Sequence, residues 1–136
     1  MTKRFGVTCA CLSFLFLGCH RSSGPPFRIP PEESKLKSPI DAIPAAVTQG
    51  DQTYHGSNCA LCHGNHGNGR GYMSGASNLN CRNWEDPASL ADYTDGDLFY
   101  IISKGKSRMP GYEGHFKPQE VWMMVAYIRA LPKKAG

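Results

Sequence analysis

A five-residue motif near the middle of the chain restricts its possible folds more than any other feature of the sequence. The motif carries Cys59, Cys62 and His63, with an alanine and a leucine between the two cysteines. On a turn of α-helix, residues three and four positions apart lie on the same face, so both thiols and the imidazole project from one side. Cys-x-x-Cys-His is the attachment sequence of c-type haem. The spacing therefore predicts a short helix whose thiols bind haem covalently and whose imidazole ligates the iron.

The same residues allow three other roles. A zinc site could use Cys59, Cys62, His63 and His66, although the histidines follow the cysteines more closely than in a zinc finger. A thioredoxin-like dithiol needs a βαβ context, which the sequence around the motif lacks. A disulfide between the two cysteines of the motif would close an unusually tight loop. Haem attachment agrees best with the motif and with the export signal described next.

The N-terminus predicts export and lipidation. Residues 5–18 form an uncharged, largely apolar run of fourteen residues after a short basic stretch. Such a run is shorter than the ~20 residues of a spanning helix and fits the apolar region of a signal peptide. Residues 15–19 resemble a bacterial lipobox, with Phe16 where leucine is usual, and this resemblance implies lipid on Cys19. We expect a lipoprotein signal peptide over residues 1–18 and a periplasm-facing lipoprotein of the bacterial cell envelope; the alternatives are an ordinary cleaved signal or a short uncleaved anchor.

A proline-rich segment, residues 19–45, follows the expected signal peptide. Six of the ten prolines of the chain lie in it, among serine, lysine and glutamate residues. Proline removes backbone donors and favours an extended conformation, so we expect a disordered tether without packed structure; the alternative is that this segment wraps onto the domain. The 26 steps from Cys19 to Ala45 span roughly 30 Å as a flexible coil and about 80 Å as a polyproline helix. Such a tether would link a folded domain, residues 46–136, to the lipid bilayer.

Residues 46–136 predict an all-α domain with three to five short helices. The first helix is expected over residues 46–60 and leads into the Cys-x-x-Cys-His motif. Apolar residues at helical spacing predict a helix over residues 95–104, with Thr94 as its N-cap. The last helix is expected over residues 118–131, where one apolar stripe faces the core. No segment alternates convincingly between apolar and polar residues as a strand does.

Further motifs give the chain a family resemblance. Glycines recur in residues 64–71 directly after the histidine, residues 94–99 read TDGDLF, and residues 106–112 read KSRMPGY. With the motif at 59–63, these segments make residues 47–131 similar to a class I monohaem c-type cytochrome domain, of the type related to cytochrome subunits of haem-copper oxidases and alternative complex III. The resemblance implies a class I cytochrome c fold, in which short helices wrap around one covalently attached haem c.

The resemblance also implies roles for individual residues. In this family the last helix crosses the first, here at Gly50 and Tyr54. The axial ligands of the haem iron would be His63 and Met109. Met109 is chosen because it precedes a proline in a glycine-flanked loop, 46 residues after His63 and between two expected helices; a methionine opposite histidine raises the reduction potential. One departure concerns residues 80–84, where the family often has a proline whose carbonyl accepts the imidazole proton. This chain has no proline there, which leaves the orientation of the imidazole open.

Other side chains are weaker candidates for the haem site. Six residues are alternatives to Met109 as the sixth ligand: Met73, Met123, Met124, His55, His66 and His115. Trp84, Tyr72 and Tyr112 could line a haem crevice or be ordinary core aromatics. Arg82 could pair with a haem carboxylate or be solvated. The glycines after the motif allow close approach of the backbone, here to the porphyrin.

These assignments predict an electron carrier and not an enzyme. The protein would be tethered to the membrane in the periplasm and would pass electrons between membrane redox complexes or other cytochromes. The alternative is a haem peroxidase or small-ligand sensor with a labile sixth site, in which His66 or His115 would supply acid–base groups. A third hypothesis is a structural module in which haem only fills the core.

Charge and cysteine count add two expectations. The formal charge is +4, and 13 basic and 11 acidic residues remain once Lys3 and Arg4 leave with the signal peptide. No run of lysine and arginine could follow a phosphate backbone, so nucleic acid is not expected as a partner. Six cysteines suggest three disulfides at first, but Cys9 and Cys11 would also leave with the signal peptide. Lipid and haem account for three more, and only Cys81 has no assigned role.

Overall fold

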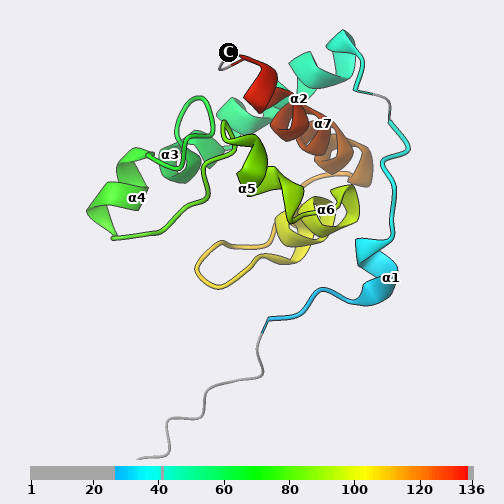
Figure 1. The fold of residues 1–136 in the computed structure, drawn as a ribbon, viewed down its shortest axis with the longest axis horizontal. Coiled ribbons are helices and arrows are strands. Elements are labelled where there is room, and N and C mark those ends of the chain that lie inside the picture. Colours follow the sequence, from blue (N-terminus) through cyan, green and yellow to red (C-terminus); the bar gives the residue numbers. More distant parts are fainter. Residues whose placement is uncertain (1–26, 41, 135–136) are drawn as a thin grey trace, which may run out of the picture.

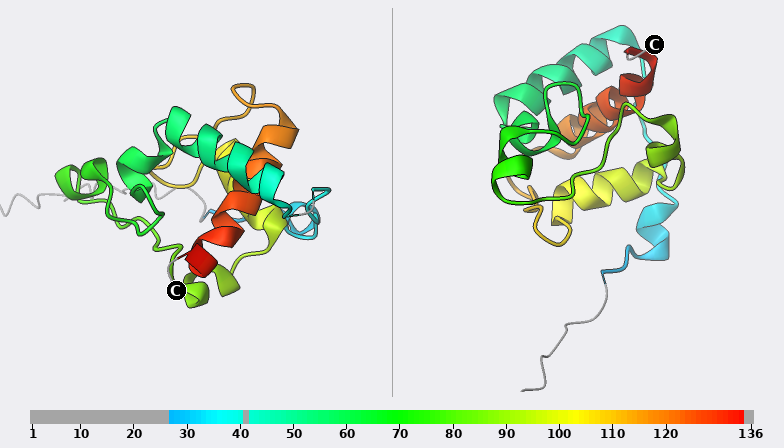
Figure 2. Two further views of the ribbon diagram at one scale, coloured as in Figure 1. Left: turned by 90° about the horizontal axis from the view of Figure 1, so that it is seen from above. Right: turned by 60° about the vertical axis from the view of Figure 1, so that its left-hand side comes forward.

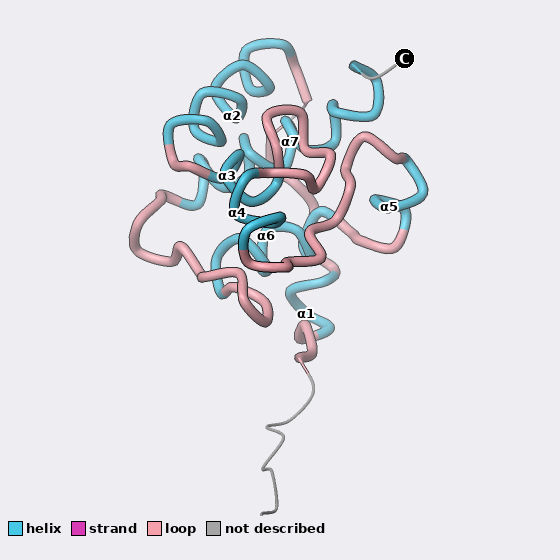
Figure 3. The backbone as a smooth tube through the Cα atoms, turned by 90° about the vertical axis from the view of Figure 1, so that its left-hand side faces the viewer, coloured by secondary structure: helices cyan, strands magenta, loops and turns pink. Residues whose placement is uncertain are grey.

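The computed structural model describes residues 27–40 and 42–134; the expected signal peptide with Cys9 and Cys11, and Cys19, lie outside these ranges. Within them, seven α-helices are joined by loops, and no strand forms (Figures 1 and 3). The helices are α1 (Pro31–Ser34), α2 (Pro44–Gly56), α3 (Cys59–His63), α4 (Tyr72–Ala76), α5 (Pro87–Ala91), α6 (Asp95–Lys104) and α7 (Pro118–Lys134). The all-α prediction is confirmed. The helices outnumber the three to five expected, because four of the seven are single turns that start at a proline or after a glycine or asparagine.

The two long helices, α2 and α7, cross and form the main helix–helix contact of the domain (Figure 2). They approach closely because Gly50 has no side chain: a Cβ there would lie 2.1 Å from the carbonyl oxygen of Met123. The side chains of Tyr54 and Tyr127 are almost fully buried beside this contact, with ring centroids 5.2 Å apart. The expected crossing at Gly50 and Tyr54 is therefore present. No helix in the described ranges, α7 included, is long and apolar enough to cross a membrane.

The prediction of a single helix over residues 46–60 is wrong, because the chain forms two helices there. α2 ends at Gly56, and Asn58 adopts a left-handed backbone conformation with φ 62° before α3 begins. Asparagine is one of the few residues that enter this region of φ and ψ readily. The turn gives the Cys-x-x-Cys-His motif a helix of its own, separate from α2.

Helix α6 begins and ends as the sequence predicts. The hydroxyl oxygen of Thr94 accepts a hydrogen bond from the N–H of Asp97 at 3.0 Å, and the Asp97 carboxylate accepts one from the N–H of Thr94 at 2.8 Å. This reciprocal pair satisfies two donors that would otherwise lack partners at the helix start. Leu98 and Ile102 on the inner face are buried in the core, so capping and apolar spacing agree on the same helix.

An arginine fastens α7 to the start of α6. The Arg129 guanidinium donates to the Asp95 carboxylate at 2.8 Å, to the carbonyl of Leu90 at 3.1 Å and to the carbonyl of Tyr93. The rigid fork of a guanidinium can satisfy several acceptors at once. This contact joins α7 to α6, to α5 and to the segment between α5 and α6.

The segment expected to be an extended tether is partly folded. Residues 27–40 contain α1, which starts at Pro31 and packs against α6 (Figure 1). The Thr94 hydroxyl donates to the carbonyl oxygen of Ser34 at 2.7 Å. The expectation of no packed structure is therefore wrong for residues 27–40. Proline at the first helical position favours a helical turn, and the side of α6 facing away from the core provides its partner.

Candidate functional site

Helix α3 brings the three residues of the motif together on one turn. Cys59, Cys62 and His63 are all half-buried, whereas Leu61 between them is exposed. Cys59 packs against the hydrophobic core, and burial raises the pKa of its thiol. The two thiols of the motif are not bridged to each other. The arrangement agrees with the helical spacing expected for a shared ligand.

The imidazole of His63 is held by aromatic stacking. Its ring lies 4.2 Å from the Trp84 ring, and the two planes are 16° apart. Within the described ranges, Nδ1 of His63 is the one buried side-chain nitrogen or oxygen without a hydrogen-bond partner. Burial lowers the pKa of His63 to about 4. The ring is therefore neutral at neutral pH, the form in which imidazole ligates a metal.

The missing proline in residues 80–84 has a consequence in the structure. No carbonyl accepts a hydrogen bond from Nδ1 of His63; Trp84 covers the ring instead. The N–H of Trp84 donates to the carbonyl of Gly67 at 2.7 Å, and its side chain is buried. Trp84 is thus a buried core aromatic whose ring also stacks on the imidazole of His63.

The glycine-rich loop, residues 64–71, folds back on α3. The N–H of Gly69 donates to the carbonyl of His63 at 2.8 Å. A Cβ at Gly69 would lie 2.4 Å from the carbonyl oxygen of Cys81, and one at Gly71 would lie 2.3 Å from a carbonyl oxygen of α3. Close approach to a porphyrin was the expected reason for these glycines. At Gly69 and Gly71 the space is instead filled by the chain itself, so both are needed for packing around α3.

Met109 lies in the loop between α6 and α7, residues 105–117. Its backbone pairs with that of Lys106 across a tight turn, with N–H to oxygen contacts of 2.9 and 3.0 Å. The Met109 side chain is half-buried and packs against the core. Arg108 donates to the carbonyl oxygen of Ser77 at 3.0 Å, which joins this loop to the segment after α4. The turn and the arginine contact together restrict where Met109 can lie.

Tyr112 lies on the same loop. Burial raises the pKa of its hydroxyl, and the negative charges that Cys59 and Cys62 carry when ionised raise it further. Met109 and Cys59 are both partly buried and pack against the hydrophobic core.

Several weaker candidates have other surroundings. Tyr72 is 79% exposed and lines a cavity that neither cysteine of the motif borders. Met124 is buried in the core between α7 and its neighbours. The Arg82 guanidinium lies 4.7 Å from the centre of the Tyr93 ring and donates to its hydroxyl at 3.1 Å. Cys81 is half-buried and unbridged.

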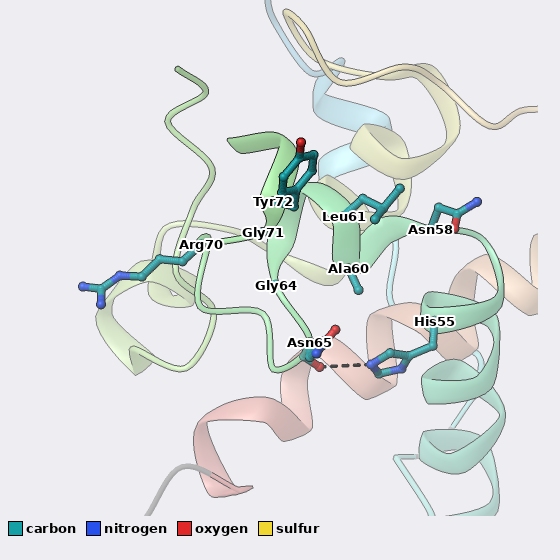
Figure 4. A pocket seen from close by; sticks show the side chains of 9 residues that line it. All are labelled: His55, Asn58, Ala60, Leu61, Gly64, Asn65, Arg70, Gly71 and Tyr72. Atoms are coloured by element: carbon teal, nitrogen blue, oxygen red, sulfur yellow. Dashed lines mark hydrogen bonds between the residues drawn. The ribbon is translucent and has the colours of Figure 1, made fainter. Parts of the chain in front are cut away.

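A cavity of about 360 Å³ lies beside α3, but it is not the site of the motif (Figure 4). It is lined by the other face of the helix, Ala60 and Leu61, and by His55 and Asn65; neither cysteine of the motif lines it. Nε2 of His55 lies 3.1 Å from the carbonyl oxygen of Asn65 and links α2 to the glycine-rich loop. This cavity and the motif side chains lie on opposite faces of α3.

The residues of α3 fit a covalently bound haem. They supply two unbridged thiols at the required spacing and a neutral imidazole with an unpartnered buried nitrogen. The zinc alternative with His66 has no support, because no group of three or more His, Cys, Asp or Glu residues in the described part of the chain could hold a metal ion.

Sequence reasoning missed two contacts that position the site. The Tyr54 hydroxyl donates to the carbonyl of Gly64 at 2.6 Å, which ties α2 to the end of α3. The Arg108 contact with Ser77 joins segments 31 residues apart. A buried tyrosine needs a partner for its hydroxyl, but the sequence does not indicate which carbonyl supplies it.

One protein-family model matches the chain. The model of cbb3-type cytochrome c oxidase subunit III covers residues 45–128, more than half of the 136 residues. No curated protein is similar enough to count as a match.

Solved structures with similar folds include three of interest. A chain of the Kuenenia stuttgartiensis reducing HAO-like protein complex is 18% identical with a TM-score of 0.58; the match covers 68% of this chain but only 46% of that one. The KustC0563 c-type cytochrome is 26% identical with a TM-score of 0.53, over 60% of this chain and 95% of that one. Cytochrome c6 of the diatom Phaeodactylum tricornutum is 22% identical with a TM-score of 0.51, over 66% and 98%. The domain therefore has the all-α cytochrome c fold.

Proposed function

We propose that this chain, which belongs to the cbb3-type cytochrome c oxidase subunit III family of c-type cytochromes, is an electron carrier with one haem c. Cys59 and Cys62 would form the thioether bonds, and His63 and Met109 would be the axial ligands. The haem iron supplies a centre that takes up and releases one electron. The observation that carries the proposal is the α3 turn, where two unbridged thiols adjoin an imidazole kept neutral by burial.

Each residue of the site has a defined task in this proposal. Cys59 and Cys62 would keep the cofactor attached, and His63, which stacks on the Trp84 ring, would bind the iron. Met109, whose backbone pairs with that of Lys106, would supply the second iron ligand. With both ligands bound, the iron would have no open position for a substrate. This favours a carrier over a haem enzyme.

The ligand assignment is tested by replacing Met109 with alanine. The variant should lose the sulfur-to-iron absorption band, and its midpoint potential should fall by on the order of 0.1 V. Met73→Ala is the matched control, since Met73 is 39% exposed on α4, and it should keep both properties. Ready binding of carbon monoxide by the wild-type protein, together with absence of the band, would instead support a peroxidase or ligand sensor with a labile sixth site.

We further propose that the domain is tethered in the periplasm. Residues 1–18 would be a lipoprotein signal peptide, and Cys19 would carry diacylglycerol and an amide-linked acyl chain, which suffice for stable anchoring. The redox partners would be membrane complexes or other cytochromes. Mass spectrometry of the mature N-terminus tests the lipid directly, and Cys19→Ser should release the holoprotein from the membrane fraction. An intact residue 1, or an unmodified Cys19, would contradict the anchor.

A further inference from the structure

Residues 27–40, which we name the strap, lie along α6 and not away from the domain (Figures 1 and 2). In the middle of the strap, the carbonyl oxygen of Ser34 accepts a hydrogen bond from the Thr94 hydroxyl at 2.7 Å. At its start, the Phe27 ring lies 6.3 Å from the Tyr100 ring and 5.4 Å from Nζ of Lys106. The strap therefore contacts α6 at its start and in its middle, and Phe27 also lies near Lys106 of loop 105–117.

A glycine in α6 fits the strap closely. A Cβ at Gly96 would lie 2.0 Å from the carbonyl oxygen of Glu33 and 3.0 Å from that of Leu36. Within an α-helix, glycine is about 1 kcal/mol less favourable than alanine. Gly96 lies in the first turn of α6 and has no left-handed backbone to explain it. Close approach of the strap backbone is therefore the structural reason for glycine at this position.

We propose that the strap is a docked part of the tether and sets how far the domain can move from its anchor. The proposal rests on the lipidation of Cys19 proposed above. With the strap docked, eight residue steps separate Cys19 from Phe27, the first strap residue in contact with α6. A chain of eight steps would span about 16 Å as a coil and about 25 Å as a polyproline helix, against roughly 30 and 80 Å for a tether that runs to Ala45.

Docking also places the start of the strap beside loop 105–117. The Phe27 ring lies near Nζ of Lys106, and the backbone of Lys106 is paired with that of Met109.

The first test is proteolysis of the full-length holoprotein. The strap contains three exposed trypsin sites, at Arg28, Lys35 and Lys37. Gly96→Ala should displace the strap, because the new Cβ meets backbone oxygens and cannot be accommodated by a side-chain rotation. Cleavage at these sites should become at least about tenfold faster, since proteolysis follows the population of the undocked form. Gly75→Ala is the matched control, with nothing within 4 Å of its Cβ, and should leave the rate unchanged.

A second variant keeps the test valid if Gly96→Ala disturbs α6. Phe27→Ala removes a strap side chain and no residue of the helical domain; it should also accelerate cleavage, by a smaller factor. Equal cleavage rates in wild type and both strap variants would overturn docking, whatever the state of Cys19.

The reach is tested by energy transfer from a dye on Cys81 to acceptor lipids in membranes. Cys81 is the single cysteine that lipid and haem leave free in the proposed holoprotein. Transfer should fall in Gly96→Ala and remain in Gly75→Ala. Equal transfer in both variants, despite faster cleavage in the first, would overturn the role of the strap in setting reach. If the wild type and both variants are absent from the membrane, the lipid anchor is refuted, and so is the role of the strap in setting reach. The cleavage rates would still show whether the strap is docked.

Discussion

The replacement of Gly50 by alanine sets two effects of opposite sign against each other. Alanine is favoured over glycine inside a helix by about 1 kcal/mol, which would stabilise α2. The new Cβ would however lie 2.1 Å from the carbonyl oxygen of Met123, where ordinary contacts begin at 3.4 Å. Because that atom belongs to the backbone of α7, relief requires the two helices to separate by more than 1 Å. Such separation loosens the packing of Tyr54 and Tyr127, which are nearly fully buried.

Overpacking of a core typically costs about 1–3 kcal/mol, and a clash against backbone belongs at the upper end. Subtracting the helix propensity leaves a net loss of about 2 kcal/mol in the free energy of unfolding. The midpoint of thermal unfolding should then fall by about 8–16 °C, since 1 kcal/mol corresponds to about 4–8 °C in a domain of this size. Urea unfolding of the holoprotein, followed by helical circular dichroism, measures the free energy directly.

Gly56→Ala is the control for this prediction. Gly56 is the last residue of the same helix, and a Cβ there meets nothing within 4 Å. It carries the propensity gain without the clash, so it should be neutral or stabilising by up to about 1 kcal/mol. If Gly50→Ala is as stable as Gly56→Ala, α2 and α7 do not approach each other at Gly50 as closely as described.

Three further predictions concern capping, an arginine contact and pH. Thr94→Ala should lower the free energy of unfolding by about 1 kcal/mol, because α6 loses its N-cap. Thr48→Ala is the control: this threonine is exposed inside α2, and its replacement should change the free energy little. Chemical denaturation of both variants measures the difference. Arg129→Lys should cost about 2 kcal/mol, because one ammonium cannot replace the fork that reaches the Asp95 carboxylate and two carbonyls, and a stability equal to wild type would contradict that network. In the protein prepared without haem, His63 takes up a proton below pH 6.5 in the unfolded state but only below about pH 4 in the folded state. The free energy of unfolding should therefore fall as the pH drops from 6.5 to 4, by roughly 3 kcal/mol in total. His63→Gln should flatten that part of the pH profile, and an unchanged slope would show that His63 is not buried as described.

The sequence anticipated the elements whose signals are local. The capping pair of Thr94 and Asp97 lies within three residues, and its hydrogen bonds form as expected. The spacing of Cys59, Cys62 and His63 needs only one helical turn to bring them together. The sequence did not reveal the left-handed turn at Asn58, which separates α3 from α2, because asparagine, although enriched in this conformation, adopts it at only a minority of positions.

Three features depend on contacts between distant parts of the chain and were decided only by the tertiary structure. Trp84 stacks on the imidazole 21 residues away, in place of a hydrogen-bonding carbonyl. The glycines at 69 and 71 make room for other backbone segments and not for a cofactor alone. The strap docks on α6 although its prolines favour extension, because Gly96 leaves space for its backbone.

The sequence by itself determined the proposed chemistry of this protein, since two thiols and an imidazole at this spacing match the attachment sequence of c-type haem. The tertiary structure decided how that chemistry is held: burial keeps the imidazole of His63 neutral, and the ring of Trp84 sets its plane. Burial and close approach are properties of the packed chain. Residues distant in sequence produce them together, and no single segment encodes them.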